Sequence, residues 1–225
     1  MSRVQGWCAA VAIFLAAPVW GQEAIAWRLQ REDAATSTKV WSGERPDGVP
    51  AFRATTVVEA RLTSLVAVLL DTTRAPAWVY RLREAALLRT DGPTRGVTLV
   101  VTSSPFPLKD RESVVAWDVA QEPNSLAVTV VCRPAADAPP ARSDRVRMSV
   151  FESRWVFTPR ADGRVEVLFE GMGDPGGNLA FPLLRHFANA AVWEGPWHTI
   201  LSLHKMVREP PFPQAELPFI REPGR

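Results

Sequence analysis

The order of two hydrophobic periods constrains the fold of this chain more than any other feature. From Leu82 to Gly171, apolar and polar residues alternate at a spacing of two, which is typical of β-strands. From about Pro182 to Arg208 the spacing becomes helical, and the apolar stripe comprises Leu183, Leu184, Phe187, Ala190, Ala191, Trp197, Ile200, Leu201 and His204. Because a long amphipathic helix has to bury its stripe, we expect it to lie across the face of the preceding sheet.

The sheet is expected to be antiparallel, because turn residues such as Asp91-Gly92 and Asp162-Gly163 separate its strands. About nine strands are predicted, near Trp27–Arg31, Thr36–Ser42, Ala51–Val58, Leu82–Thr90, Arg95–Thr102, Ser113–Ala120, Leu126–Cys132, Arg145–Phe157 and Val165–Gly171. A helix over Arg61–Leu70 interrupts them, Pro76 closes or restarts it, and Pro196 predicts a kink or break in the last helix. The fold class is therefore α+β, a strongly curved antiparallel sheet wrapped on a long C-terminal helix, with a ligand cavity between them.

Residues 1–21 are typical of a signal peptide. Arg3 gives a positive start, the run from Trp7 to Ala17 is apolar and uncharged, and Val19-Trp20-Gly21 fits a cleavage site. Ala24-Ile25-Ala26 is a second candidate site, but it lies farther from the apolar run, so we favour cleavage after Gly21. The run is too short to span a bilayer, and a buried N-terminal helix is the alternative. We expect an exported protein that is periplasmic or, as the alternative, secreted.

The mature chain would have the size of one domain with a substantial core. Arg3 is the only charged residue before position 22, so 25 of the 26 Lys and Arg residues remain against 24 Asp and Glu. This near balance gives no field that would favour nucleic acid. Cys132 is the only cysteine after position 21, so no intramolecular disulfide can form. We assign 22–208 to the domain and the proline-rich stretch 209–225 to an unpacked tail.

Three short motifs connect the chain to a known family. The segment PFPLKDR at 105–111 resembles the P-W-P-x-x-D-R segment of START lipid-transfer domains. The segment GDPGGNL at 173–179 resembles the D-P-x-G segment before their last helix. Asp71 and Trp78 match a D-x-x-x-x-x-x-W pattern, and all three motifs have the order and spacing of the family.

The resemblance extends over Trp27–Arg208 and is that of an exported bacterial START member within the helix-grip superfamily. Two positions depart from the family pattern, since Phe106 replaces the more usual Trp and Glu112 stands where Asp is common. The resemblance implies a helix-grip fold that encloses one lipid or other hydrophobic molecule and carries or presents it without catalysis. We also expect no cofactor, a monomer and transient contact with a membrane.

On this resemblance, the gate loop with Phe106, Leu108 and Arg111 lies near the mouth of the cavity, and either this loop or the last helix opens for ligand entry. The two prolines of the loop reduce the entropy lost when it is fixed, and Phe106 can touch a membrane or a ligand. Asp110, Arg111 and Glu112 tie the base of the loop to the neighbouring strands. For Arg111 alone, we favour a structural ion pair over a gating role.

Strand parity predicts the lining of the cavity. With Asp118, Arg133 and Glu166 facing water, the inward positions are Val115, Trp117, Val119, Val128, Val130, Cys132, Val165, Val167 and Phe169. From the last helix, Leu184, Phe187 and Ala191 face them. Arg147, or Arg145 in its place, reaches inward to hold a polar head group, and a solvated face is the alternative. For each single apolar residue, ordinary core packing is the alternative.

Other chemistries have less support. Gly171–Gly176 matches G-x-G-x-x-G, but no strand follows the next helix, so there is no βαβ unit to hold a dinucleotide. The three histidines, His186, His198 and His204, form no i, i+4 pair, which disfavours a metal site. The second hypothesis is a cyclase-like or hydrolase-like helix-grip enzyme, which needs an acid–base pair in the same cavity. The third is a structural or protein-binding module with a filled core.

Overall fold

The computed structural model describes residues 25–176 and 182–224, with the side chains of 182–189 left undescribed. Its strands are β1 (Arg28–Asp33), β2 (Thr38–Glu44), β3 (Pro50–Val58), β4 (Leu82–Thr90), β5 (Arg95–Thr102), β6 (Arg111–Gln121), β7 (Val128–Pro134), β8 (Val146–Arg147), β9 (Val150–Pro159) and β10 (Val165–Asp174). The helices are α1 (Leu62–Leu70), α2 (Ala75–Trp78), α3 (Pro182–Met206) and the 3-10 turn η1 (Phe212–Gln214). The expected signal peptide lies outside the described residues.

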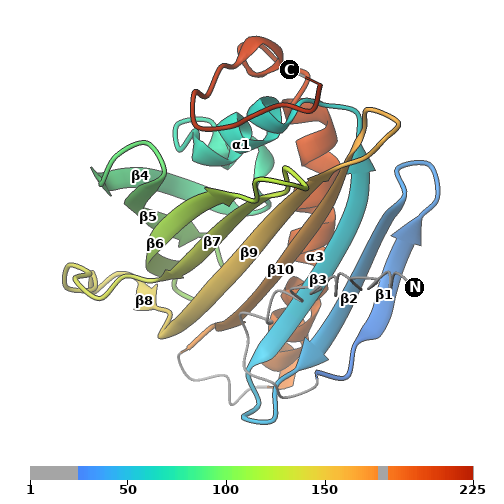
Figure 1. Ribbon diagram of the computed structural model, residues 1–225. Helices are drawn as coiled ribbons and strands as arrows, with labels where there is room; N and C mark the ends of the chain where they lie inside the picture. Colours follow the sequence, from blue (N-terminus) through green and yellow to red (C-terminus); the bar gives the residue numbers. More distant parts are fainter. Residues whose placement is uncertain (1–24, 177–181, 225) are drawn as a thin grey trace, which may run out of the picture.

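The strands form one sheet in the order β1-β2-β3-β10-β9-β7-β6-β5-β4, with antiparallel pairing between all these neighbours. The short strand β8 pairs in parallel with the start of β6. Figure 1 shows the strong twist of the sheet, with α3 running behind it and α1 at one end. The predicted helix-grip fold is therefore confirmed.

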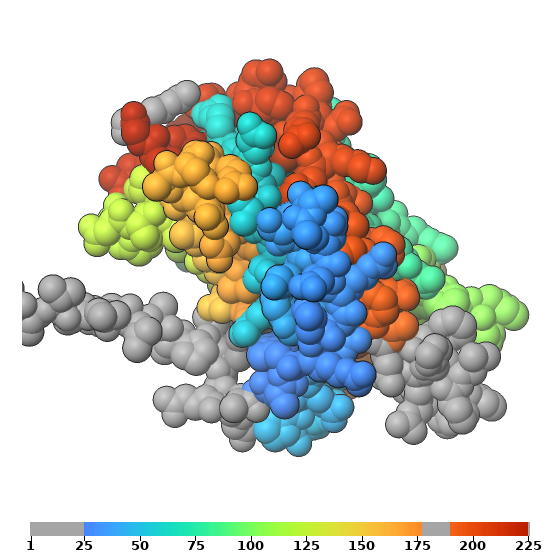
Figure 2. Space-filling view, turned by 90° about the vertical axis from the view of Figure 1, so that its right-hand side faces the viewer, coloured from blue at the N-terminus to red at the C-terminus, as the bar shows by residue number. Residues whose placement is uncertain are grey.

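Helix α3 packs on the inner face of the sheet. Thr56 of β3 lies 2.8 Å from the Nε2 atom of His204 on α3, and the guanidinium of Arg31 on β1 lies 4.5 Å above the Trp197 ring. Ile200 and Leu203 of α3 are fully buried in the core. Figure 2 shows this side of the molecule, where β1 (blue) lies beside α3 (orange to red).

Helix α1 also packs against the core, and its sequence is apolar almost throughout. Leu62, Leu65, Val66 and Val68 are fully buried in the same core as Trp155 of β9. Burial of each such side chain contributes about 1.5–3 kcal/mol, so α1 is held by packing rather than by helix propensity. One surface of α1 thereby becomes fixed above the sheet.

The expectation of an unpacked tail is wrong. Phe212 and Ile220 are buried at 2% and 7% exposure, and the Arg74 guanidinium lies 5.4 Å above the Phe212 ring. The Glu222 carboxylate accepts hydrogen bonds from the backbone N–H groups of Leu62 at 3.2 Å and Thr63 at 2.8 Å. It thus caps the start of α1, where N–H groups lack partners within the helix.

Two predicted elements differ in detail from the structure. The strand expected over Arg145–Phe157 is divided into β8 and β9, because Met148 donates its backbone N–H to Glu112 and draws the first part beside β6. The last helix has no break at Pro196, since α3 runs without interruption from Pro182 to Met206. Burial of Trp197 and Ile200 in the next turn holds the helix together despite the missing N–H.

Candidate ligand cavity

A cavity of about 200 Å³, here called the inner chamber, lies between the helices and the inner face of the sheet. Its walls come from α1, α2, the strands β4–β7, β9 and β10, and α3, and its described lining residues are Leu69, Leu70, Thr72, Ala75, Trp78, Val79, Leu82, Ala85, Thr98, Val100, Thr102, Val115, Trp117, Val130, Cys132, Phe151, Ser153, Trp155, Phe169 and Thr199. Among these described residues none is charged. The chamber therefore suits an apolar molecule.

A second hollow of about 480 Å³, the outer chamber, adjoins the first. The two share Val79, Thr102, Phe151, Ser153, Phe169 and Thr199 in their walls. The outer chamber also includes Tyr80, Glu152 and Asp174, so charged groups enter the lining only here among the described residues. The combined shape is an apolar interior with a more polar outer part.

Polar groups in the inner chamber are few and mostly satisfied. Trp117 donates its indole N–H to the Thr98 hydroxyl at 3.1 Å, and the Thr199 hydroxyl accepts the Tyr80 backbone N–H at 3.1 Å. Burial raises the pKa of the Cys132 thiol to about 11, although a hydrogen bond with Ser153 opposes this shift. The thiol is therefore neutral at physiological pH and is a poor nucleophile.

Several predicted lining residues meet in this chamber. Val115, Trp117, Val130 and Phe169 all lie in its wall. Ala191 lies in the wall of the outer chamber. That these residues bind a ligand stays a prediction.

Other predicted lining residues lie elsewhere. Val128 and Val167 face the same side of the sheet but are fully buried in the packed core, away from either chamber. They belong instead to the core cluster that also contains residues of α1 and α3. The side chains of Leu184 and Phe187 lie outside the described residues.

The inward placement of Arg147 is wrong. Its guanidinium binds the Glu112 carboxylate at 2.9 and 3.1 Å and the Pro139 carbonyl oxygen at 3.1 Å. Because side chains alternate along β6, Glu112 points to the face opposite Val115 and hence away from the chamber. Arg145 likewise pairs with Glu84 at 2.8 Å, on that outer face.

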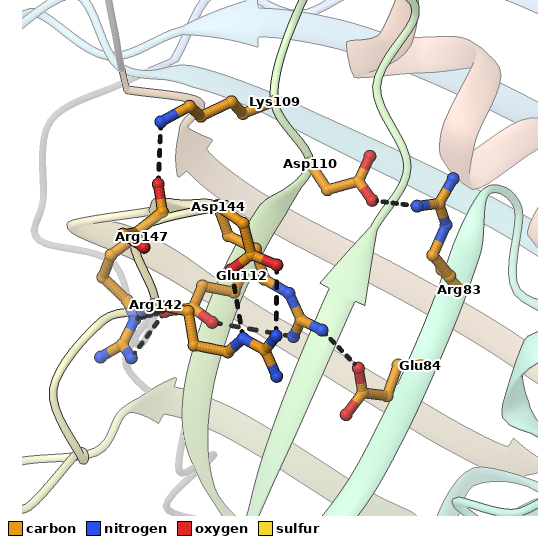
Figure 3. Close-up of polar contacts among 10 residues, drawn as sticks. Arg83, Glu84, Lys109, Asp110, Glu112, Arg142, Asp144 and Arg147 are labelled. Atoms are coloured by element: carbon orange, nitrogen blue, oxygen red, sulfur yellow. Dashed lines mark hydrogen bonds and ion pairs between the residues drawn. The ribbon is translucent and has the colours of Figure 1, made fainter.

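Figure 3 shows the charged cluster that covers this outer face near the start of β6. The Glu112 side chain is only 2% exposed, and besides Arg147 it accepts the backbone N–H of Arg142 at 3.2 Å. Asp110 pairs with Arg83 at 2.6 Å, and Lys109 donates to the Ser143 carbonyl oxygen at 2.8 Å. The cluster fastens the 134–147 segment to the sheet and holds the base of the neighbouring loop.

Arg111 points to the inner side and joins two of the sequence motifs. Its guanidinium donates to the Ser104 hydroxyl at 3.2 Å, the Lys109 carbonyl at 2.7 Å and the Pro175 carbonyl at 3.0 Å. These acceptors are neutral, so the interpretation of Arg111 as one half of an ion pair is wrong. Burial lowers the pKa of the guanidinium from its usual value, and the Asp110 charge acts in the opposite direction.

The predicted gate loop exposes its aromatic tip. Phe106 is 97% exposed, whereas Leu108 is half-buried and donates its N–H to the Pro105 carbonyl oxygen at 2.9 Å. Asp110 accepts the Ser104 backbone N–H at 3.0 Å and thereby closes the base of the loop. Of the three residues expected to tie the loop base to the neighbouring strands, Asp110 does so through Arg83 of β4 and Glu112 through Arg147 of β8, whereas Arg111 bonds to loop groups instead.

Sequence reasoning missed much of the aromatic wall, above all Trp78, Phe151 and Trp155. The ring of Trp155 stacks on that of Phe169 with centroids 3.8 Å apart and planes at 11°. The alternation of side chains along β9 could have identified Phe151 and Trp155. Arg154 faces outward toward Glu170, so these two residues, which belong to the other set of alternating positions, face inward. The sequence pointed to Trp78 only through a family motif, because α2 is one turn long and too short to show a helical pattern.

A helix-grip protein with an apolar chamber between sheet and helix is the class that this fold and cavity define. The START domain model matches residues 15–206, and the chain belongs to the START domain family. The structure is similar to the STAR-related lipid transfer protein from Xanthomonas axonopodis, with a TM-score of 0.70 and 25% identity over 81% of this chain and 99% of that chain.

Two further comparisons extend this result. Human StAR-related lipid transfer protein 5 has a TM-score of 0.67 and 14% identity over 81% of this chain and 86% of that chain, a likeness of fold alone. An uncharacterized protein of Pseudomonas aeruginosa is 24% identical over 195 residues, which cover 84% of this chain and 92% of that protein.

Two features are absent from the described residues. Within 25–176 and 182–224, no helix has both the length and the apolar character needed to cross a bilayer. In the same part of the chain, no three His, Cys, Asp or Glu side chains gather in a way that could hold a metal ion.

Proposed function

We propose that this protein encloses a single hydrophobic molecule, a lipid or a compound of similar polarity, and carries it without changing it. The observation that supports the proposal best is the inner chamber, whose described lining is apolar, aromatic and uncharged. Family membership agrees, and so do the two similar structures, both of lipid transfer proteins. Removal of apolar surface from water drives binding of this kind, and the ligand needs no charge to hold it.

The same lining argues for a carrier over an enzyme. General acid–base catalysis needs a titratable pair within hydrogen-bond reach of one reacting atom. The described lining of the inner chamber pairs no carboxylate with a histidine, and its one thiol has a pKa raised to about 11. The enzyme alternative would have to place its chemistry at Glu152 or Asp174 in the outer chamber.

We propose that ligand exchange takes place while the Phe106 loop rests on a membrane surface. An aromatic ring that is 97% exposed costs little to bury in the interfacial region of a bilayer. The base of the loop is fixed by Arg111, which also holds Pro175 in the wall of the outer chamber. Contact at Phe106 can therefore act on the outer chamber through a short, rigid connection. The signal-peptide pattern supports a carrier that works in the periplasm.

The deciding experiment is native mass spectrometry of the full chain purified from its own cell envelope, followed by organic extraction. One hydrophobic molecule per protein would support the carrier and give its chemical class. An empty protein that also fails to bind a broad panel of lipids contradicts the proposal. A recovered molecule that is chemically altered during incubation would favour the enzyme instead.

A further inference from the structure

Strand β4 ends the sheet on the side away from β1, and no described strand lies beyond it (Figure 1). In an antiparallel pair only every second residue bonds to the neighbouring strand, so about half of the backbone N–H and C=O groups of β4 point away from β5. Leu87 and Leu88, in the second half of β4, are 48% and 45% exposed. An edge that combines free backbone groups with exposed leucines is suited to pairing with another strand.

The opposite edge of the sheet is protected against such pairing. Strand β1 has the sequence RLQRED, in which charged residues alternate with few apolar ones, and charge is a common device that keeps edge strands apart. The stretch Ala85–Leu88 in the middle of β4 contains no charge. Bulges at Arg83 and Leu88 bend β4, but the pairing with β5 is regular from Glu84 to Leu87. Strand β4 is therefore the less protected of the two edges.

The charges around the uncharged stretch indicate which partner fits. Arg83 and Glu84 precede it, and Arg89 and Asp91 follow it. A second copy that pairs antiparallel about a twofold axis near Leu87 brings Glu84 beside the partner strand's positive end and Arg83 beside its negative end, which stabilises a strand pair. The side chains of Arg83 and Asp91 are 64% and 52% exposed, so they stay accessible despite their ion pairs within the chain. The edge is thus self-complementary, as a twofold interface requires.

A lipid surface fits this edge less well than a protein strand does. The hydrocarbon region of a bilayer offers no hydrogen-bonding groups to the free N–H and C=O groups of β4, whereas an added strand pairs with them. The charges at both ends of the stretch would also have to approach the bilayer together with the two leucines.

We propose that β4 is a dimer interface, at which two copies of this chain pair antiparallel through Ala85–Leu88 about a twofold axis near Leu87. This inference goes beyond the proposed function, does not depend on the ligand, and replaces the expectation of a monomer. Leu82 and Ala85 of β4 line the inner chamber. The second copy therefore also braces a wall of the chamber that is otherwise the edge of the sheet.

The test is sedimentation equilibrium of the full chain at concentrations up to about 100 µM, where even weak pairing is populated. Wild-type protein is expected to reach twice the mass of one chain. In Leu87→Lys two like charges meet near the axis, so the dissociation constant is expected to rise by about tenfold or more. Leu87→Glu has the same effect on its own. A mixture of the two variants forms dimers again, because each axis then joins a positive and a negative side chain.

The matched control is Leu29→Lys on β1, the other edge of the sheet, where Leu29 is 45% exposed. This variant keeps the dimer. If Leu87→Lys fails to fold, hydrogen exchange of the wild type takes its place. The backbone N–H groups of 85–88 are expected to exchange more slowly at high protein concentration than at low concentration, because the partner strand supplies acceptors for them.

Wild-type protein that keeps the mass of one chain at every concentration, with no added protection at 85–88, overturns the inference. So does a dimer that survives in Leu87→Lys or is lost equally in Leu29→Lys, because the contact then lies elsewhere. A mixture of the Lys and Glu variants that stays monomeric contradicts the twofold pairing near Leu87. Each of these results leaves the carrier function standing.

Discussion

The Nε atom of Arg111 donates a hydrogen bond to the carbonyl oxygen of Pro175 at 3.0 Å and so joins two loops 64 residues apart in the sequence. One loop carries Phe106 at its tip, and the other leads from β10 toward α3. This contact therefore links the loop with the exposed tip to the end of β10, next to the wall of the outer chamber.

Replacing Arg111 with Met is expected to lower the free energy of unfolding by about 2–3 kcal/mol, because the Pro175, Lys109 and Ser104 acceptors lose their common donor. Arg111→Lys recovers only part of this loss, since an ammonium cannot reproduce the fork of the guanidinium. Urea unfolding of both variants measures the effect. The control is Arg83→Met, an exposed partner of Asp110 whose loss costs at most about 1 kcal/mol. Equal losses at the two positions would contradict a special role for Arg111.

The buried carboxylate of Glu112 provides the second prediction. Glu112→Gln leaves Arg145 and Arg147 facing an uncharged group on the outer face, which is expected to cost about 3–5 kcal/mol. Asp144→Asn, in an exposed pair with Arg142, is the matched control and changes stability by less than about 1 kcal/mol. Ligand binding by folded Glu112→Gln protein should be unchanged, because the cluster lies on the face opposite the chamber. Weaker binding there would show that the two faces are coupled.

The pKa of Cys132 sets a dependence of stability on pH. The folded-state pKa is raised from 9.0 to about 11, so the fold favours the neutral thiol. Its contribution is complete below pH 9 and is lost as the pH rises from about 9 to 11, by roughly 2–3 kcal/mol in total. The slope of stability against pH in this window should be smaller in Cys132→Ala than in the wild type. Parallel slopes would mean that other groups dominate.

Phe106 should matter for membranes and not for folding. Phe106→Ser is expected to leave the free energy of unfolding within about 0.5 kcal/mol of wild type, because the ring is 97% exposed. Association with lipid vesicles should weaken by about tenfold or more, the equivalent of one apolar side chain. Leu88→Ser on β4 tests whether any exposed apolar residue has this effect, since Leu88 is 45% exposed outside the loop. Similar losses in the two variants would remove the special role of the loop.

Most of the cavity-lining residues that could be predicted were predicted from the alternation of side chains along the strands. It placed Val115, Trp117, Val130 and Phe169 in one wall, because a period of two fixes the face of a strand whatever it packs against. It could not separate Val128 from Val130, since the depth of a residue along its strand depends on where the helices sit. That position is a property of tertiary packing.

Long-range partners explain the remaining errors. Arg147 was expected inside because an alternating pattern around it suggested one long strand, whereas the parallel pairing of β8 with β6 turned it toward Glu112. The segment after 208 was expected to be unpacked because its prolines exclude regular structure. Proline excludes helices and sheets without excluding burial, and Phe212 and Ile220 supply the apolar surface that holds this segment.

The hydrogen bonds from Leu62 and Thr63 to Glu222 hold the start of α1 against the segment that contains Glu222. Helix α1 contributes Leu69 and Leu70 to the ceiling of the inner chamber, so its anchorage determines how firmly that ceiling is closed. The segment around Glu222 therefore helps to keep α1 in place over the chamber. Any process that pulls on these residues or buries them in another protein would loosen this wall of the inner chamber, far from the Phe106 loop.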